Sequence, residues 1–209
     1  MKIPEPPVLS RAHVHSTDIT PLLAALRQIH PLTTGVETFL RTHITSYPVR
    51  KRKLLLKEGA PCEHIYFIVK GALRGFIREG HKDITTWINT EGHLISSIFS
   101  LDQGGPGVEN IQALENGELL MMSYRDLETL YEEFPETNVL ARKLLQHYYA
   151  DAERRAFIVR LTKAENKYRH FLLHHQHLSN RIPLKYIASF LGMTLETLSR
   201  VRKKFSSKL

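Results

Sequence analysis

The stretch "IASFLGMTLETLSRVRKKF", residues 187–205, decides the fold of the C-terminal part of the chain. Pro183 lies where a short helix begins, and Gly192 ends that helix because glycine readily adopts the left-handed turn conformation. Ala188 is small enough for a second helix to cross closely there. Thr194 can then cap the second helix. The spacing therefore predicts a helix-turn-helix rather than a basic amphipathic tail.

The second helix separates an apolar side from a polar side. Leu198, Val201 and Phe205 form the apolar side when residues are projected at helical spacing. We expect the opposite side to contact double-stranded DNA, because arginine can donate two hydrogen bonds to guanine and glutamate can accept one from cytosine. The predicted DNA-binding residues are Thr194, Glu196, Thr197, Ser199, Arg200, Arg202, Lys203, Lys204 and Lys185. A mere surface salt link between Glu196 and Arg200 is the alternative.

Positive charge is concentrated near the C-terminus. The 209 residues include 29 Lys and Arg against 21 Asp and Glu, a formal net charge of +8. Residues 181–209 carry seven basic residues and one acid, a balance of +6, so the first 180 residues carry only +2. This distribution indicates a nearly neutral module joined to a phosphate-facing surface, with a solvated basic tail as the alternative.

The composition is that of an ordinary globular protein, with 42% hydrophobic residues. Cys62 is the only cysteine, which excludes a disulfide framework and a multi-cysteine metal site within one chain. The N-terminus has no apolar signal-peptide core, and no apolar run is long enough to span a membrane. We therefore expect a cytoplasmic protein with no membrane contact.

The middle of the chain predicts an antiparallel β-barrel. From Tyr47 onward, short apolar or alternating runs are separated by turns such as "EGAP" and "EGHKD". Asn116 and Gly117 predict a hairpin between two apolar segments, and the barrel should close near Tyr124. Residues 18–45, before the barrel, predict short helices.

A long helix follows the barrel. About forty residues from Glu136 lack glycine and proline, and apolar residues recur at steps of three or four. A helix this long favours pairing with its twin in a homodimer, and packing on its own barrel is the alternative. The predicted dimerisation residues are Leu140, Leu144, Tyr148, Arg155 and Ile158. The predicted organisation is residues 1–135 for the N-terminal helices and effector-type barrel, 136–160 for the dimerisation helix and 161–209 for the helix-turn-helix domain.

Over about 190 residues the chain resembles the Crp/Fnr superfamily of bacterial transcription regulators. "LLLKEGAPCEHIYFIVKGALRGF" is similar to the first half of a cyclic-nucleotide-binding barrel, "EFPE" and the long helix to the dimerisation region, and "RIPLKYIASFLGMTLETLSRVRKK" to one branch's ending. Glu196, Ser199 and Arg200 match the family's Glu-x-x-Ser-Arg base-reading set. The resemblance implies a homodimer on an inverted-repeat operator, with recognition helices about 34 Å apart in successive major grooves and RNA polymerase as a further partner.

The fold class expected from this resemblance is α+β. It comprises an N-terminal antiparallel β-barrel of the cyclic-nucleotide-binding-like jelly-roll type, a long dimerisation helix and a C-terminal helix-turn-helix domain. Only four residues follow Phe205, so we expect the β-hairpin wing after the recognition helix to be truncated or absent.

The region corresponding to the family's cyclic-nucleotide site departs from the family pattern. Ser96 and Ser97 replace the Gly-Glu pair that holds the ribose, and Val108 and Glu109 replace the Arg-Ser pair that holds the phosphate. No Lys or Arg occurs between Leu94 and Tyr124, so a buried phosphodiester would lack a compensating charge. We expect an effector other than cyclic AMP, or none, and place its pocket at Ser96, Ser97, Phe99 and Glu109.

We predict neither a catalytic site nor a metal or cofactor site. His170 and His174 have the spacing of two helix ligands, but no third ligand is obvious nearby, and none of the 12 histidines stands out as a heme ligand. The predicted function is sequence-specific DNA binding in transcription regulation. The alternatives are a small-molecule sensor that acts through protein partners with a degenerate DNA module, and a barrel-type enzyme, for which no paired-carboxylate or nucleophile–base arrangement is seen.

Overall fold

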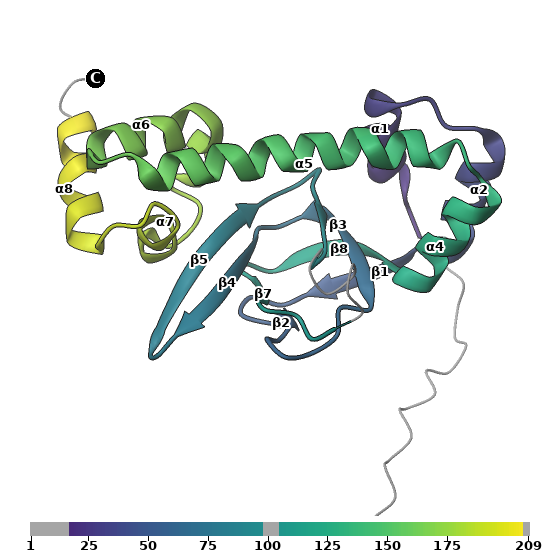
Figure 1. Cartoon of the computed structure of the whole chain (residues 1–209), viewed down its shortest axis with the longest axis horizontal. Coiled ribbons are helices and arrows are strands. Elements are labelled where there is room, and N and C mark those ends of the chain that lie inside the picture. Colours follow the sequence, from purple (N-terminus) through teal and green to yellow (C-terminus); the bar gives the residue numbers. More distant parts are fainter. Residues whose placement is uncertain (1–16, 98–104, 207–209) are drawn as a thin grey trace, which may run out of the picture.

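The structure is a computed structural model that describes residues 17–97 and 105–206 (Figure 1). Two helices come first, α1 (Thr20–Ile29) and α2 (Thr34–His43). The strands are β1 (Thr45–Val49), β2 (Leu54–Leu56), β3 (His64–Lys70), β4 (Leu73–Glu79), β5 (Lys82–Asn89), β6 (Leu94–Ile95), β7 (Asn110–Ala113) and β8 (Gly117–Ser123). They are followed by α4 (Tyr124–Glu133), α5 (Thr137–Arg160), α6 (Ala164–His175), the 3-10 helix η1 (Gln176–Leu178), α7 (Leu184–Phe190) and α8 (Leu195–Ser206). The predicted α+β class is confirmed.

The strands form two antiparallel sheets rather than one closed barrel. One sheet has the order β1-β8-β3-β6 and the other β2-β7-β4-β5. The expected closed barrel is therefore wrong: β2 and β6, with three and two residues, are too short to carry a hydrogen-bonded ladder from one sheet to the other. Side chains close the space between the sheets instead, with Ile68, Leu73, Ile111 and Leu119 completely buried. We call these two sheets the β-roll.

The predicted hairpin at Asn116 and Gly117 is also wrong, although a turn occurs there. β7 pairs with β2 and β4, whereas β8 pairs with β1 and β3, so this turn connects the two sheets. Position 117 requires glycine because the backbone of Lys70 lies close to it: a Cβ here would be 2.2 Å from the Lys70 carbonyl oxygen. Asn116 accepts a hydrogen bond from the Lys51 backbone N–H at 2.8 Å. A turn signal thus identified the bend but not the strands that it joins.

Helix α5 lies along the β-roll and connects the two ends of the molecule (Figure 1). At one end it packs with α1, α2 and α4, where Leu23, Leu26 and Leu40 are buried in a shared core. At the other end Ile158 joins the core of α6, α7 and α8. The helix breaks at Leu161, which has an extended backbone, and α6 begins three residues later. The span of α5 is nearly that of the predicted helix at 136–160.

Candidate DNA-binding and effector sites

The turn between α7 and α8 is closed by the hydrogen bonds of a Schellman motif. The Met193 N–H donates to the Ala188 carbonyl at 3.0 Å, and the Gly192 N–H donates to the Ser189 carbonyl at 3.0 Å. Gly192 has a φ of +60°, the left-handed conformation that the sequence required. Ala188 is only 2% exposed at the contact between the helices. The two helices and the turn are therefore placed as predicted.

Helix α8 has one buried and one exposed face. Thr194 caps it by accepting a hydrogen bond from the Thr197 N–H at 3.2 Å. Leu198 and Val201 are buried, and Phe205 packs edge-on against Tyr168 with ring centroids 5.4 Å apart. The exposed side chains are Glu196, Ser199, Arg200, Lys203 and Lys204. A backbone hydrogen bond holds the pKa of the Glu196 carboxyl below its usual value, so this group is ionised at neutral pH.

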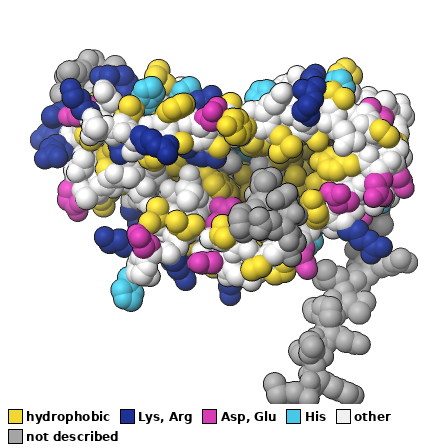
Figure 2. Space-filling view, viewed as in Figure 1, with side chains coloured by type: hydrophobic (Ala, Val, Ile, Leu, Met, Phe, Trp, Pro, Cys, Tyr) yellow, Lys and Arg dark blue, Asp and Glu magenta, His cyan; other side chains and the backbone are white. Residues whose placement is uncertain are grey.

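Two of the residues predicted to contact DNA phosphate also bind other parts of the chain. Arg202 donates to the Ser179 carbonyl at 3.0 Å and to Asn180 Oδ1 at 2.9 Å. Lys204 forms an ion pair with Glu165 of α6 at 3.1 Å. Arg202 therefore fastens η1 and the following turn to α8, and its predicted contact with DNA phosphate stays untested. Lys and Arg side chains gather at the end of the molecule formed by α6 and α8 (Figure 2).

Helix α7 is docked on the edge strand β5 of the β-roll. The Ser189 hydroxyl accepts a hydrogen bond from the Thr85 N–H at 2.9 Å and donates to the Asp83 carbonyl at 3.2 Å. The Arg74 guanidinium, which is almost completely buried, forms an ion pair with Asp83 at 2.8 Å and lies 4.2 Å from the Tyr186 ring centre. No sequence pattern indicated Arg74, because its partners come from β5, β7 and α7.

Arg181 is a second link between the helix-turn-helix and the β-roll. Its guanidinium donates to Glu91, at 2.9 Å for one of the bonds, and to Glu115. Hydrogen bonds from Arg181 lower the pKa of Glu91 to about 2. Arg181 is one of the seven basic residues that make the C-terminal segment positive, yet its charge faces the acidic turns of the β-roll. The basic excess near the C-terminus is therefore only partly available to DNA.

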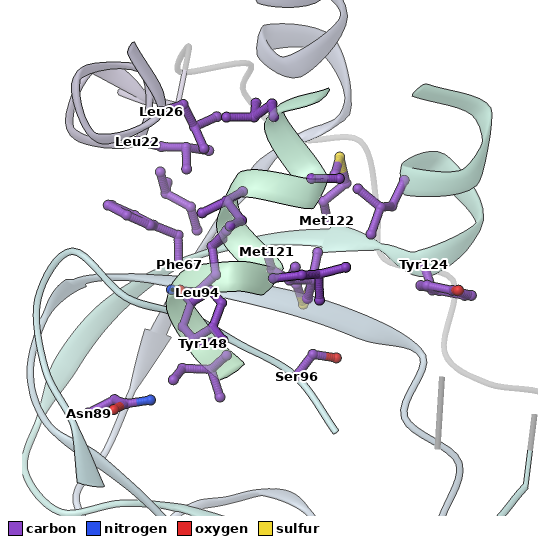
Figure 3. A pocket seen from close by; sticks show the side chains of 18 of the residues that line it. Leu22, Leu26, Phe67, Asn89, Leu94, Ser96, Met121, Met122, Tyr124 and Tyr148 are labelled. Carbon is purple, nitrogen blue, oxygen red and sulfur yellow. Dashed lines mark hydrogen bonds between the residues drawn. The ribbon is translucent and has the colours of Figure 1, made fainter. Parts of the chain in front are cut away.

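A cavity of about 1010 Å³ lies between the β-roll and the helices that cover it. Its walls are mostly aliphatic, and the polar Asn89 and Ser96 lie opposite Leu22 and Leu26 (Figure 3). Hydrophobic side chains also surround a hollow beneath α5 in the space-filling view (Figure 2). Tyr148 ties α5 to the cavity wall, since its hydroxyl accepts a hydrogen bond from the Leu94 N–H at 2.7 Å. A volume and lining of this kind are typical of small-molecule sites.

Glu109 and Arg155 place an acidic and a basic side chain at the cavity wall. Trp87 Nε1 donates to Glu109 Oε2 at 2.9 Å, and burial raises the pKa of Glu109. The hydrogen bond from Trp87 acts in the opposite direction and lowers that pKa. Gly75 provides room for this contact, because a Cβ there would lie 2.1 Å from Trp87 Nε1. Arg155 projects from α5, and burial lowers its pKa.

Comparisons with known proteins agree with this architecture. A family model described as the cyclic nucleotide-binding domain matches residues 48–134. The transcriptional activator protein Anr of Pseudomonas aeruginosa is 23% identical in an alignment of 175 residues that covers 76% of this chain and 69% of Anr. The FixK2 structure from Bradyrhizobium japonicum has a TM-score of 0.68 and 20% identity, covering 79% of this chain and 85% of FixK2. A Eubacterium rectale protein described as a Crp/Fnr-family regulator has a TM-score of 0.67 and 15% identity, covering 85% of each chain.

Residues 48–134 thus match the cyclic nucleotide-binding domain, and the chain has the fold of Crp/Fnr-type regulator structures. The nucleotide-type domain precedes the helix-turn-helix, in the order expected from the sequence. Among the described helices, none is both long and apolar enough to cross a bilayer. Residues 17–97 and 105–206 also contain no group of three or more His, Cys, Asp or Glu side chains arranged to hold a metal ion.

The positions that correspond to the family's nucleotide-binding pairs lie at different depths. Ser96 lines the cavity and donates to the His64 carbonyl at 3.3 Å, whereas Ser97 is completely buried and does not line it. Val108 is 49% exposed, and Glu109 faces the cavity. Phe99, the fourth predicted pocket residue, lies outside the described residues. Of the three predicted pocket residues that the structure describes, Ser96 and Glu109 line the cavity, as does Val108. Their role in effector binding stays a prediction.

Within the single chain, the five predicted dimerisation residues face their own chain, and their role in a dimer stays a prediction. Leu140 and Ile158 are buried in the two end cores, and Leu144, Tyr148 and Arg155 line the cavity. Sequence periodicity identified an apolar face of α5, but this face packs on the β-roll. This packing agrees with the alternative weighed for the long helix, which was packing on its own barrel.

A different stripe of α5 is open to a partner. Leu145 is 55% exposed and Tyr149 is 67% exposed. With Ala152, Ala156 and Val159 they follow alternating steps of four and three residues, the spacing of a coiled-coil seam. This spacing is visible in the sequence, but two apolar stripes compete there, and only the packing shows which stripe the β-roll covers.

Proposed function

We propose that the chain is a sequence-specific DNA-binding transcription regulator that acts as a homodimer on an inverted-repeat operator. The observation that carries the proposal is the exposed face of α8. Glu196, Ser199 and Arg200 project from a capped helix whose opposite side is held by Leu198 and Val201. These three side chains supply the donors and acceptors that read base edges in the major groove.

The dimer that we propose pairs the two copies of α5 through Leu145, Tyr149, Ala152, Ala156 and Val159. Parallel or antiparallel pairing along one symmetric stripe would bury the large apolar side chains that the monomer leaves exposed. In the proposed dimer, two recognition helices would contact the two half-sites of the operator.

We propose that the effector is not cyclic AMP. A cyclic nucleotide needs polar partners for its ribose and a positive charge for its phosphate. At the corresponding positions the chain has an exposed valine, Val108, and a carboxyl group, Glu109. Titration calorimetry of the purified protein with cyclic AMP should show no saturable heat at micromolar concentrations.

DNA binding is tested by selecting an operator from a random duplex pool and measuring mobility shifts with Arg200→Ala. Loss of a bidentate contact with guanine costs about 1–3 kcal/mol, so we expect affinity for the selected site to fall roughly tenfold to a hundredfold. The matched control is Arg125→Ala, which removes one exposed positive charge from α4 at the other end of the molecule. Equal losses in both variants, or no binding of the pool by wild type at low salt, would refute the proposed function.

A further inference from the structure

The cavity between the β-roll and the helices is long, and its polarity differs between its ends. Leu140 and Arg155 both line it from α5, and fifteen residues separate them, which is about 22 Å along the helix axis. The end near Leu140 is bounded by Leu22, Leu26 and other aliphatic side chains of α1 and α2 (Figure 3). A molecule that fills this space must therefore be long and must be apolar over most of its length.

Among the described residues that line the cavity, Arg155 is the only one with a basic side chain. Its guanidinium forms no hydrogen bond or ion pair with any of residues 17–97 and 105–206, although the neighbouring Arg154 is paired with Asp151 at 2.7 Å. A half-buried guanidinium has given up part of its hydration, and a planar carboxylate can restore two hydrogen bonds at once. The charge at this end of the cavity thus favours an anion with one carboxylate.

Glu109 lies near enough to Arg155 for their charges to interact, yet the two form no ion pair within the described residues. Burial raises the pKa of Glu109, which favours its neutral form. A neutral carboxyl group can donate a hydrogen bond to a bound carboxylate, whereas an ionised one would repel it. A phosphodiester with its ribose would instead need several polar partners, which the aliphatic walls do not offer.

We propose that the cavity binds a long-chain aliphatic monocarboxylate, a fatty acid, with its carboxylate on Arg155 and its chain running beneath α5 toward Leu22 and Leu26. This proposal rests on the proposed function in one respect, that the ligand acts as the effector of a DNA-binding protein. The ligand would bridge the β-roll and α5, and Tyr149 and Ala152 of the exposed stripe also border the cavity. Occupancy would thereby act on the surface through which two chains pair.

The test is titration calorimetry of the full chain at pH 7.5 with sodium octanoate, sodium dodecanoate and methyl dodecanoate, all at micromolar concentrations. We expect saturable binding of dodecanoate, at least tenfold weaker binding of octanoate, and at least tenfold weaker binding of the methyl ester, which has the chain but no charge. Benzoate, which has the charge but no chain, should not bind. Because these comparisons use wild-type protein, they do not depend on the folding of a variant.

Variants then locate the carboxylate. Arg155→Met keeps the side-chain volume and removes the charge, and should weaken dodecanoate binding at least tenfold. Arg154→Met, one residue away with an exposed side chain, should leave binding unchanged. Glu109→Gln, which mimics the neutral carboxyl group, should retain dodecanoate binding. Absence of dodecanoate binding, equal affinity for acid and ester, or equal losses in the two arginine variants would overturn the proposal. None of these results bears on operator binding, which the Arg200→Ala experiment measures separately.

Discussion

At the scale of single residues, two glycines of the β-roll leave room for groups from distant parts of the chain. Gly75 leaves room for the Trp87 ring and its hydrogen bond to Glu109, and Gly117 lets the turn between the sheets pass the Lys70 carbonyl. A left-handed backbone is not the reason for glycine at either position, because the described glycines with positive φ do not include Gly75 or Gly117. Their role is steric, and it depends on segments distant in the sequence.

Replacement of Gly117 by alanine should destabilise the protein by about 3 kcal/mol, because its Cβ would meet a backbone oxygen that cannot move freely. Urea unfolding followed by circular dichroism measures this loss. The matched control is Gly80→Ala: Gly80 has a φ of +60° and no atom within 4 Å of the added Cβ, so only about 1 kcal/mol of backbone strain is expected. Similar losses in both variants would show that the close contact at Gly117 is not decisive.

At the scale of elements, α5 uses its faces for different purposes. The face that includes Leu140 and Tyr148 packs on the β-roll and lines the cavity, while the stripe that includes Leu145 and Tyr149 borders the cavity and is mostly exposed. The same helix thus provides the cavity wall and the proposed dimer seam, on sides roughly a quarter to a third of a turn apart. A ligand that moves one face moves the other, because a helix responds as a rigid unit.

Leu145→Glu should convert the proposed dimer into a monomer, because a buried unpaired carboxylate at the seam would cost more than the pairing gains. Sedimentation velocity of the purified variant measures the mass. His147→Glu introduces the same charge at an exposed position of α5 that faces away from Tyr149, and this control should remain dimeric. A wild-type protein that sediments as a monomer at tens of micromolar would contradict the dimer itself.

At the scale of the whole molecule, the helix-turn-helix is held on the β-roll by polar contacts. Ser189 binds β5, Arg74 contacts Tyr186, and Arg181 joins the turns that carry Glu91 and Glu115. Apolar contacts hold it as well, since Ile88 and Leu114 share a buried core with Ile187. The charged and hydrogen-bonded contacts should make the strength of the docking depend on pH and salt.

The Glu91 carboxyl should make stability depend on pH in the acid range. Its pKa is about 2 in the folded protein and 4.5 in the unfolded chain, so its stabilising effect is complete above pH 4.5 and disappears as the pH falls toward 2. Urea unfolding at pH 7, 4.5 and 3 should show this loss in wild type and a smaller loss in Arg181→Met. Arg27→Met, which removes the exposed pair between Arg27 and Glu37, should leave the acid loss as in wild type. An unchanged acid loss in Arg181→Met would contradict the role of this contact.

Local sequence patterns were enough to predict the helix-turn-helix, the long helix and the strand-rich middle region. Their signals are local: Pro183, Gly192 and Thr194 set helix ends within a few residues, and apolar spacing sets the faces of α8. The cavity is lined by an acidic side chain, Glu109, which was predicted in the effector pocket, and by a basic one, Arg155, which was assigned to the dimer.

Only the tertiary structure decided which strands pair across Asn116 and Gly117, which stripe of α5 the β-roll covers, and that Arg181 faces Glu91 rather than DNA. Each of these depends on contacts between segments from 20 to more than 100 residues apart, such as the 90 residues between Arg181 and Glu91. Periodicity and capping report the conformation of a short segment, but not which of its faces meets a distant one. That choice is made by packing, which fills the interior with side chains from the whole chain at once.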